Sequence, residues 1–350
     1  MSIIEPNSNK QKKIHERVRS LILQSSEKIT QNIQITTGRI SDTRLKEIRS
    51  YKGAGGKTYV IEAALSTSLA GEVDGGIVIK FANDLEAEVD NARRLASLLT
   101  SRQTDWEKWK KNHEITARIR RFPDRLFAPE VIHVIPEVKA LILEFLSGFT
   151  PLLQLEVKQV DRWGYAGYAL ARLHGSERQK INVQLYNPIF NLLKTCVEEE
   201  FLDYWIEILK QSSGGVDYIH GDSHLSNILV SPNRIAWIDA ILLPQLDRMD
   251  DVGYIISHAI QENVATNIGL GINDSKLIKS ITRSWVPLIL TTYKQTYDIS
   301  QLYSELPLDF FIGSHLIIRA RLWEKEIATV LTRLGQKFIY EMPISKMLLE

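Results

Sequence analysis

Three polar side chains in one short segment have the types and the spacing that phosphoryl transfer requires. Asp222 follows a histidine and a glycine, Asn227 lies five residues later, and Asp239 lies 12 residues further on, at the end of an apolar run. A carboxylate can orient an attacking hydroxyl and accept its proton, while an amide oxygen and a second carboxylate can hold the magnesium that neutralises phosphate oxygens. The pattern therefore favours Asp222 as a catalytic residue and Asn227 and Asp239 as metal ligands.

Short β runs on both sides must position these side chains. The runs YI, ILV and IAWI are rich in β-branched and aromatic residues, and SPNR between the last two has the composition of a turn. We expect a hairpin that carries both metal ligands, within a catalytic loop over residues 218–240. Such a hairpin sets the separation of the two ligands without a long connecting loop.

The segment HGDSHLSN, followed by a strand that ends in Ile-Asp, resembles the aminoglycoside phosphotransferase and choline kinase family. Members of that family are small-molecule kinases that share the protein-kinase fold. The resemblance extends over residues 48–265. It implies an α+β, bilobal protein-kinase-like fold with a small antiparallel-sheet N-lobe and a larger helical C-lobe. It also implies an enzyme that uses ATP and Mg²⁺ to phosphorylate a hydroxyl group of an antibiotic, an amino alcohol, a sugar or a natural-product intermediate.

The family resemblance also implies an ion pair that holds the nucleotide. Lys80, at the end of the β run GGIVIKF, matches the strand lysine that pairs with the α- and β-phosphates. Glu88 matches the glutamate that holds this lysine. It lies on the following amphipathic helix, expected over 84–100, on the same face as apolar residues at i+4 and i+7. Glu86 stays an alternative partner for Lys80.

Two further segments match the nucleotide-binding elements of the family. The glycine-rich turn with Gly53, Gly55 and Gly56 lies where such kinases cover the phosphates, since glycines allow close approach and present amide hydrogens. It is not a P-loop, because that motif requires a glycine at position 51, where the chain has tyrosine, and a helix where a strand is expected. In the run ALILEFLSG, the backbone of Glu144 and Leu146 is expected to bond to the adenine edge.

Composition and charge narrow the class of protein. The chain has 350 residues, 44% of them hydrophobic, which is enough apolar material for a sizeable core. Its net charge of +1 gives no overall field that would steer it onto nucleic acid or a membrane surface. The single cysteine, Cys196, excludes an intramolecular disulfide. Because no run approaches about 18 apolar residues and the first residues lack a secretory pattern, we expect a cytoplasmic protein without a membrane or nucleic-acid partner.

The pattern along the chain divides it into three parts. Residues 1–45 have helical periodicity and predict an N-terminal helical extension. Residues 46–147 predict the N-lobe, a nucleotide-binding sheet with one helix, which also contains a highly charged insertion at 101–126. Residues 148–350 predict the helical C-lobe, with the catalytic loop as a β-like island between its helices.

Two other functions stay open at this point. A chain of this kind could bind a nucleotide as an inactive scaffold, or it could phosphorylate proteins. Only 12 residues separate Asp239 from Asp251, near the start of the next predicted helix, which leaves no room for the activation segment of a protein kinase. The apolar run at 240–244 argues for an acceptor less cationic than an aminoglycoside. The sequence gives neither the acceptor nor the oligomeric state.

Overall fold

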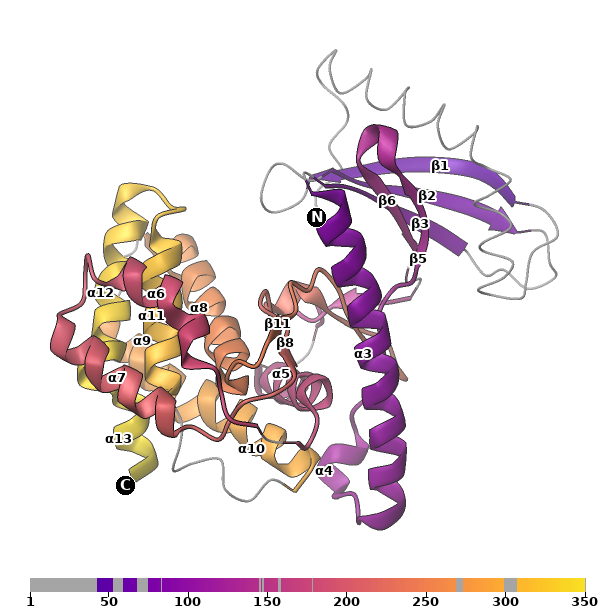
Figure 1. Ribbon diagram of the computed structural model, residues 1–350. Helices are drawn as coiled ribbons and strands as arrows, with labels where there is room; N and C mark the ends of the chain where they lie inside the picture. The colour runs from indigo at the N-terminus through magenta and orange to yellow at the C-terminus, as the bar shows by residue number, and fades with distance from the viewer. Residues whose placement is uncertain are drawn as a thin grey trace. The chain divides into compact units, whose positions relative to one another are not determined.

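The computed structural model describes residues 43–52, 59–67, 75–82, 84–144, 146, 148–156, 159–177, 179–268, 273–298 and 307–349. The chain forms two compact units, one containing Met1–Ala96 and Ala128–Phe149, the other Ser97–Phe127 and Thr150–Glu350. The first unit is built on a small antiparallel sheet and the second is mostly helical (Figure 1). The predicted α+β organisation, with a small sheet part and a larger helical part, is confirmed.

Five antiparallel strands form the sheet of the first unit, in the order β1-β2-β3-β6-β5. Their bounds are β1 (Thr43–Lys52), β2 (Tyr59–Thr67), β3 (Gly75–Phe81), β5 (Val131–Ile135) and β6 (Ala140–Glu144). A 3-10 turn, η1 (Pro136–Val138), joins β5 to β6 as the expected hairpin. Strand β3 lies at the centre, where Lys80 is opposite Val60 on one side and Leu141 on the other.

Helix α3 (Leu85–Asn112) begins in the first unit and packs on this sheet. Its first turn is capped by Asp84, whose Oδ1 accepts a hydrogen bond from the backbone amide three residues on, at 3.1 Å. Val89 on the inner face of the helix packs with Leu141 and Leu143 of β6. The amphipathic pattern expected over 84–100 therefore places one helix face on the sheet.

The same helix continues through the first part of the segment 101–126 that we expected to be an insertion of the N-lobe. No glycine or proline interrupts it before its end at Asn112, so nothing in the local sequence stops it. From Ser97 to Phe127 the chain groups with the second unit instead. Trp106 contributes to this grouping, since it is buried and packs edge-on against Tyr168 and Tyr297 of the second unit, with ring centroids 6.3 and 5.4 Å away.

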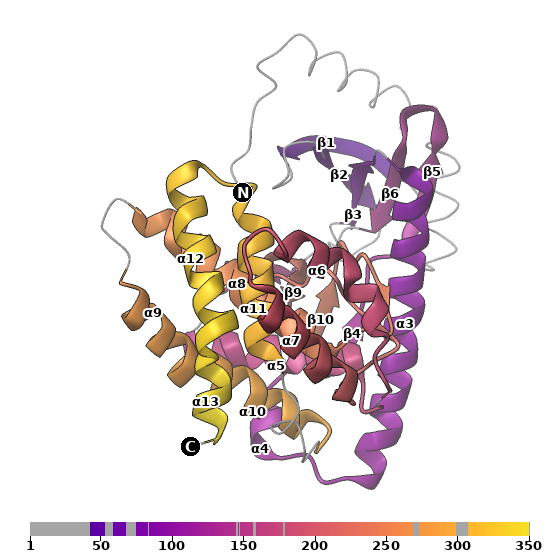
Figure 2. The same cartoon turned by 60° about the vertical axis from the view of Figure 1, so that its left-hand side comes forward.

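The second unit is a bundle of helices around two small sheets. Its helices are α4 (Ala117–Arg120), α5 (Gln159–His174), α6 (Asn187–Leu193), α7 (Glu199–Gln211), α8 (Arg248–Asn267), α9 (Asp274–Ser280), α10 (Val286–Thr296), α11 (Leu308–Ala320), α12 (Lys325–Glu341) and α13 (Pro343–Leu349). A π-helical turn (Ile281–Trp285) joins α9 to α10. Helices α8, α11 and α12 lie side by side (Figures 1 and 2). Helices α5 and α10 cross closely, because a Cβ at Gly167 would lie 2.3 Å from the carbonyl oxygen of Ile289.

Short strands inside this bundle carry the expected catalytic loop. Strands β4 (Arg125–Phe127), β10 (Arg234–Trp237), β9 (Ile228–Val230) and β7 (Thr150–Pro151) form a sheet in that order. Strand β8 (Tyr218–Ile219) pairs with β11 (Leu243–Pro244). The 3-10 turn η3 (Leu225–Asn227) leads directly into β9, whereas a second one, η2 (Val183–Tyr186), leads into α6.

The helical extension predicted over residues 1–45 overlaps the first strand of the sheet by three residues. Strand β1 begins at Thr43, which pairs with Thr67, so sheet pairing rather than local periodicity determines the start of the strand. Residues 1–42 lie outside the described residues.

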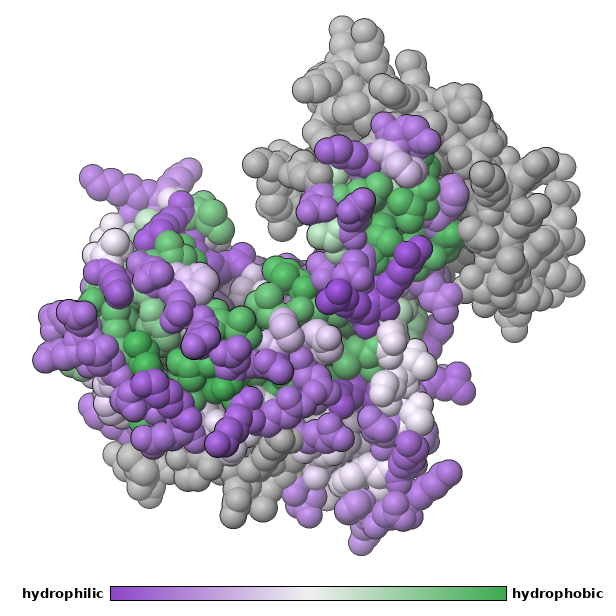
Figure 3. All heavy atoms as spheres, viewed as in Figure 1, coloured by the Kyte–Doolittle hydropathy of each residue, from purple (hydrophilic) through white to green (hydrophobic). Residues whose placement is uncertain are grey.

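The described helices include none that is long and apolar enough to cross a membrane. The face viewed in Figure 3 has hydrophobic patches between hydrophilic side chains. The large exposed apolar side chains of the helical unit include Leu185, Leu192 and Tyr204.

Candidate functional site

Strands β9 and β10 form the predicted hairpin, and its open end carries Asn227 and Asp239. The strands are antiparallel, with Ile228 opposite Trp237, and both of these side chains are buried. One step further, the amide of Ile238 donates to the carbonyl of Asn227 at 3.1 Å. Asn227 and Asp239 therefore leave the hairpin at the same end, as the sequence spacing predicts.

Asp222 lies on the loop between β8 and η3, next to Asn227. The Nδ2 group of Asn227 donates to the main-chain carbonyl of Asp222 at 2.9 Å and lies 3.4 Å from its carboxylate Oδ2. The Asp222 side chain is 31% exposed, whereas Asn227 is buried. The structure thus brings together the predicted catalytic carboxylate and the predicted amide ligand, with the carboxylate accessible.

Asp251, in the first turn of α8, forms hydrogen bonds with the backbone of the loop that carries Asp222. Its Oδ2 accepts hydrogen bonds from the amide of His220 at 2.7 Å and from His174 Nε2 at 2.9 Å, and its Oδ1 accepts one from the amide of Gly221 at 3.0 Å. Burial raises the pKa of Asp251, but the hydrogen bonds and nearby histidines outweigh it, so the pKa lies below its ordinary value. A buried carboxylate thus orients the backbone on which Asp222 lies.

His220 links the loop to the hairpin. Its Nδ1 accepts a hydrogen bond from the amide of Asp222 at 3.3 Å, and its Nε2 lies 3.0 Å from the carbonyl of Ile238. Because an amide only donates and a carbonyl only accepts, the ring proton lies on Nε2. Burial lowers the pKa of His220, which favours this neutral form. His220 is therefore a structural residue that connects Asp222 to the strand leading to Asp239.

The residues Asn227 and Asp239 fit a magnesium ion. The Nδ2 of Asn227 faces Asp222, so the side-chain atom left to bind a cation is the hard oxygen Oδ1. The carboxylate of Asp239 is exposed. Within the part of the chain that the structure describes, no group of three or more His, Cys, Asp or Glu side chains could hold a metal ion. An amide oxygen and one carboxylate are a donor set that suits Mg²⁺ when phosphate and water oxygens complete its coordination.

The first unit contains the predicted ion pair. Lys80 on β3 and Glu88 in the first turn of α3 approach to 2.6 Å between Nζ and Oε2. Their side chains are 13% and 37% exposed, so the pair is partly screened from water. Glu86, the alternative partner, is exposed on the same helix turn. The structure thus favours Glu88 for the role that the sequence left open.

The remaining predicted nucleotide-binding positions are only partly described. Glu144 ends β6, and its amide donates to the carbonyl of Glu130 at 2.9 Å. Leu146 is half-buried, and its carbonyl accepts from the amide of Phe149 at 3.3 Å. These contacts do not test adenine binding, so both roles stay predictions. The three positions of the predicted glycine-rich loop lie outside the described residues: Gly53, Gly55 and Gly56.

Sequence reasoning missed two side chains that contact Asp222. The hydroxyl of Tyr254 on α8 donates to Asp222 Oδ1, and Arg319 Nη1 on α11 donates to the hydroxyl of Tyr254. Arg319 Nη1 also lies 3.9 Å from Asp222 Oδ1. Tyr254 could have been found, because it lies three residues after Asp251 and thus on the same helix face. Arg319 has no such signal, since only the packing of α11 on α8 brings it to the loop.

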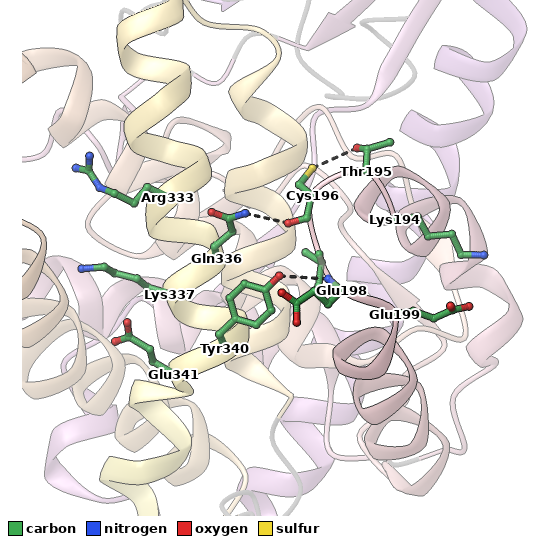
Figure 4. A pocket seen from close by; sticks show the side chains of 11 residues that line it. Lys194, Thr195, Cys196, Glu198, Glu199, Arg333, Gln336, Lys337, Tyr340 and Glu341 are labelled. Atoms are coloured by element: carbon green, nitrogen blue, oxygen red, sulfur yellow. Dashed lines mark hydrogen bonds between the residues drawn. The ribbon is translucent and has the colours of Figure 1, made fainter.

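One surface pocket lies elsewhere on the helical unit, between α12 and the segment that joins α6 to α7 (Figure 4). Gln336 Nε2 donates to the carbonyl of Cys196 at 2.9 Å across it. Its lining contains none of the residues that the sequence analysis selected as catalytic or nucleotide-binding. The lining contains both cationic and anionic side chains, namely Lys194, Arg333, Lys337, Glu198, Glu199 and Glu341, which indicates no ligand of one charge.

Comparison with known proteins gives similarity at the level of structure only. No family model and no curated protein matches the chain. Among solved structures, the chain is similar to a choline/ethanolamine kinase family protein from Mesorhizobium loti, with 12% identity and a TM-score of 0.42 over 93% of this chain and 98% of that one. It is also similar to an amicoumacin kinase in complex with AMP-PNP, Ca²⁺ and Ami, with 14% identity and a TM-score of 0.43 over 90% of this chain and 94% of that one. A glucosamine kinase matches with 13% identity and a TM-score of 0.41, over 89% of this chain and 96% of that one.

Proposed function

We propose that this chain is an ATP- and magnesium-dependent phosphotransferase whose acceptor is a hydroxyl group of a small molecule. One observation carries the proposal: Asp222 and the oxygen ligands Asn227 and Asp239 lie on one loop and hairpin, braced by the buried Asp251. A braced carboxylate beside two hard oxygen ligands suits in-line phosphoryl transfer, where catalysis is mostly positioning and charge stabilisation.

In this proposal Asp222 orients the acceptor hydroxyl and accepts its proton. The hydroxyl oxygen forms a bond to the γ-phosphorus of ATP, the bond from that phosphorus to the bridging oxygen breaks, and ADP leaves. Asn227 and Asp239 hold Mg²⁺, which supplies positive charge to the phosphate oxygens when it is bound. The exposed carboxylate of Asp222 supports this role, because an acceptor must reach it.

The nucleotide-binding part of the proposal rests on the first unit. Lys80, oriented by Glu88 at 2.6 Å, pairs with the α- and β-phosphates. The backbone of Glu144 and Leu146 bonds to the adenine edge, and the glycine-rich segment covers the phosphates. We place the enzyme in the cytoplasm, where ATP is supplied.

The test is release of ADP from MgATP by the purified chain, measured with a panel of alcohols that covers amino alcohols, sugars and antibiotics. We expect one class to raise the rate well above that in water. Asp222→Asn is expected to lower turnover about 1,000-fold with MgATP binding retained, since removing a catalytic group costs on this order. A variant that keeps more than about a tenth of wild-type turnover would show that Asp222 does not have this role.

Asp203→Asn is the matched control, because Asp203 is an exposed aspartate on α7. Its turnover is expected to equal that of the wild type. Two results would contradict the proposal. One is labelled phosphate that enters proteins but no small alcohol. The other is tight MgATP binding without any release of ADP, whether an alcohol of the panel or water is offered as the acceptor.

A further inference from the structure

Two side chains from different helices end on one oxygen of the Asp222 carboxylate. Tyr254 of α8 donates its hydroxyl to Asp222 Oδ1, and Arg319 of α11 donates Nη1 to the hydroxyl oxygen of Tyr254. Tyr254 is 8% exposed and the Arg319 side chain is 26% exposed, so this chain of contacts is largely shielded from water. The three groups belong to the same helical unit.

These hydrogen bonds have only one possible direction. A guanidinium has donors and no acceptor, so the hydroxyl oxygen of Tyr254 must accept from Arg319. The phenol has a single hydrogen, which is then left to point at the carboxylate. Arg319 thereby determines the orientation of the Tyr254 hydroxyl, and Tyr254 determines the rotation of the Asp222 carboxylate.

Two neighbouring side chains pack against the Tyr254 ring. The guanidinium of Arg319 lies over one face of the ring, 4.9 Å from its centroid. His315 meets the ring edge-on at 5.0 Å, and its Nε2 lies 2.6 Å from Asp250 Oδ1. Among the described residues, the buried Nε of Arg319 has no hydrogen-bond partner. A buried donor without a partner costs stability, so fold stability alone does not account for an arginine here.

The two oxygens of Asp222 are therefore unequal. Oδ1 receives the hydrogen bond of Tyr254, with the Arg319 charge 3.9 Å away. Among the described residues, the side-chain nitrogens that approach Oδ2 are Asn227 Nδ2 at 3.4 Å and His224 Nε2 at 3.8 Å. Oδ2 is the oxygen that remains for an acceptor hydroxyl.

We propose that Tyr254 is a positioning residue that presents Asp222 Oδ2 to the acceptor, and that Arg319 acts through Tyr254 by orienting its hydroxyl. This inference rests on the proposed function, because it assigns the oxygen through which Asp222 would accept the proton. The inference adds Tyr254 and Arg319 to the site. Both act on the orientation of the Asp222 carboxylate, so their effects on turnover are shared and not independent.

A double-mutant cycle tests the joint effect, with ADP release from MgATP as the probe and water or the most active alcohol as the acceptor. Tyr254→Phe removes the hydroxyl and keeps the ring, and Arg319→Met removes the donors and keeps much of the length. Each single variant is expected to lower kcat about tenfold with the KM for MgATP unchanged. The double variant is expected to match Tyr254→Phe alone, since both changes break the same chain of hydrogen bonds. Arg319→Lys, which keeps a donor, is expected to restore most of the lost kcat.

A second arginine–tyrosine pair in the same unit gives a matched control. Arg172 Nη1 donates to the hydroxyl of Tyr168 at 2.7 Å, and both residues are buried and lie on α5. Tyr168→Phe makes the same chemical change and is expected to lower Tm with kcat within about twofold of the wild type.

Three results would overturn the positioning role. Multiplicative losses in the double variant would show separate effects, an unchanged kcat in Tyr254→Phe would show no effect, and an equal loss of kcat in Tyr168→Phe would show only a general loss of packing. ADP release by the wild type that does not depend on Asp222 would instead overturn the proposed function, and the positioning role with it.

Discussion

The helical unit contains two groups of polar residues around aspartates, one buried and one open. In the buried cluster, Asp251 accepts from His174 and from two loop amides, and His174 in turn meets the hydroxyl of Tyr293 at 2.9 Å. His174 and Tyr293 are 0% exposed and Asp251 is 1% exposed. In the open group, Asp222 and Asp239 keep carboxylate surface accessible. The backbone of residues 220–222 connects the two groups.

The two groups differ in how the carboxylate oxygens of their aspartates are hydrogen-bonded. Both oxygens of Asp251 accept protein hydrogen bonds, so the protein itself compensates its burial and the group holds structure. One oxygen of Asp222 accepts the hydrogen bond of Tyr254 while the side chain stays 31% exposed, so part of its hydrogen-bonding capacity is left for a ligand. Changes in the open group should therefore affect activity far more than stability, and changes in the buried cluster should do the reverse.

Of the predicted changes, Asp239→Ala in the open group should have the largest effect, and this effect is on turnover. We expect turnover to fall about 1,000-fold or more, because loss of the proposed metal ligand would remove charge stabilisation of the phosphates. The rise in Tm on adding MgATP should disappear, while the Tm without ligand should change little. Thermal melts with and without MgATP measure both effects, with Asp203→Ala as the control. A full MgATP shift in Asp239→Ala would assign the metal to other residues.

Asp251→Ala in the buried cluster should have the next largest effect, and this effect is on stability. It leaves His174 and the amides of His220 and Gly221 without their acceptor, which costs on the order of 3 kcal/mol of the free energy of unfolding. Urea denaturation measures this loss, and Asp203→Ala should stay within about 0.5 kcal/mol of the wild type. A loss below about 1 kcal/mol would mean that Asp251 does not support the loop.

The smallest predicted effect is a dependence of stability on pH, which arises from buried groups around Asp251. Burial lowers the pKa of His174 and of His220 below the ordinary value of 6.5, so the unfolded chain binds protons that the folded chain does not. Stability is therefore complete above pH 6.5 and falls as the pH drops below it, by up to about 1.4 kcal/mol per unit for each group. Asp251, whose pKa is lowered from 3.8, adds its loss only at still lower pH.

Urea denaturation at pH 7.5, 6.5 and 5.5 measures this slope. His174→Gln should be less stable at pH 7.5 and should lose less stability on acidification. An equal slope in both proteins would exclude His174 as one of the groups that cause it.

Local patterns predicted the β9–β10 hairpin because its residues lie within one short stretch. Asn227 and Asp239 leave strands whose register follows from a four-residue turn, and Lys80 meets Glu88 because a strand and the next helix bring them together. Periodicity failed where tertiary contacts decide. Helix α3 extends beyond the expected end at residue 100, and the burial of Trp106 joins that extension to the second unit.

The side-chain contacts of Asp222 show the same limit. Arg319 lies almost 100 residues from Asp222 along the chain, on a helix whose apolar pattern predicts only that it packs. Which of its polar side chains reaches the catalytic loop depends on how α11 lies against α8, and nothing in the sequence near either residue records that. Long-range pairing of this kind requires the fold.

Asp239 adopts a left-handed backbone conformation, with φ of 57°. For a side chain with a Cβ this conformation costs roughly 1 kcal/mol, which a glycine would not incur. Asp239→Gly should therefore melt at the same or a higher temperature than the wild type while it loses metal binding. Mutational drift without selection for activity would favour glycine at this position. Under the proposed function, an aspartate at this position would be a stability–activity trade-off, whereas an inactive scaffold would gain nothing from it.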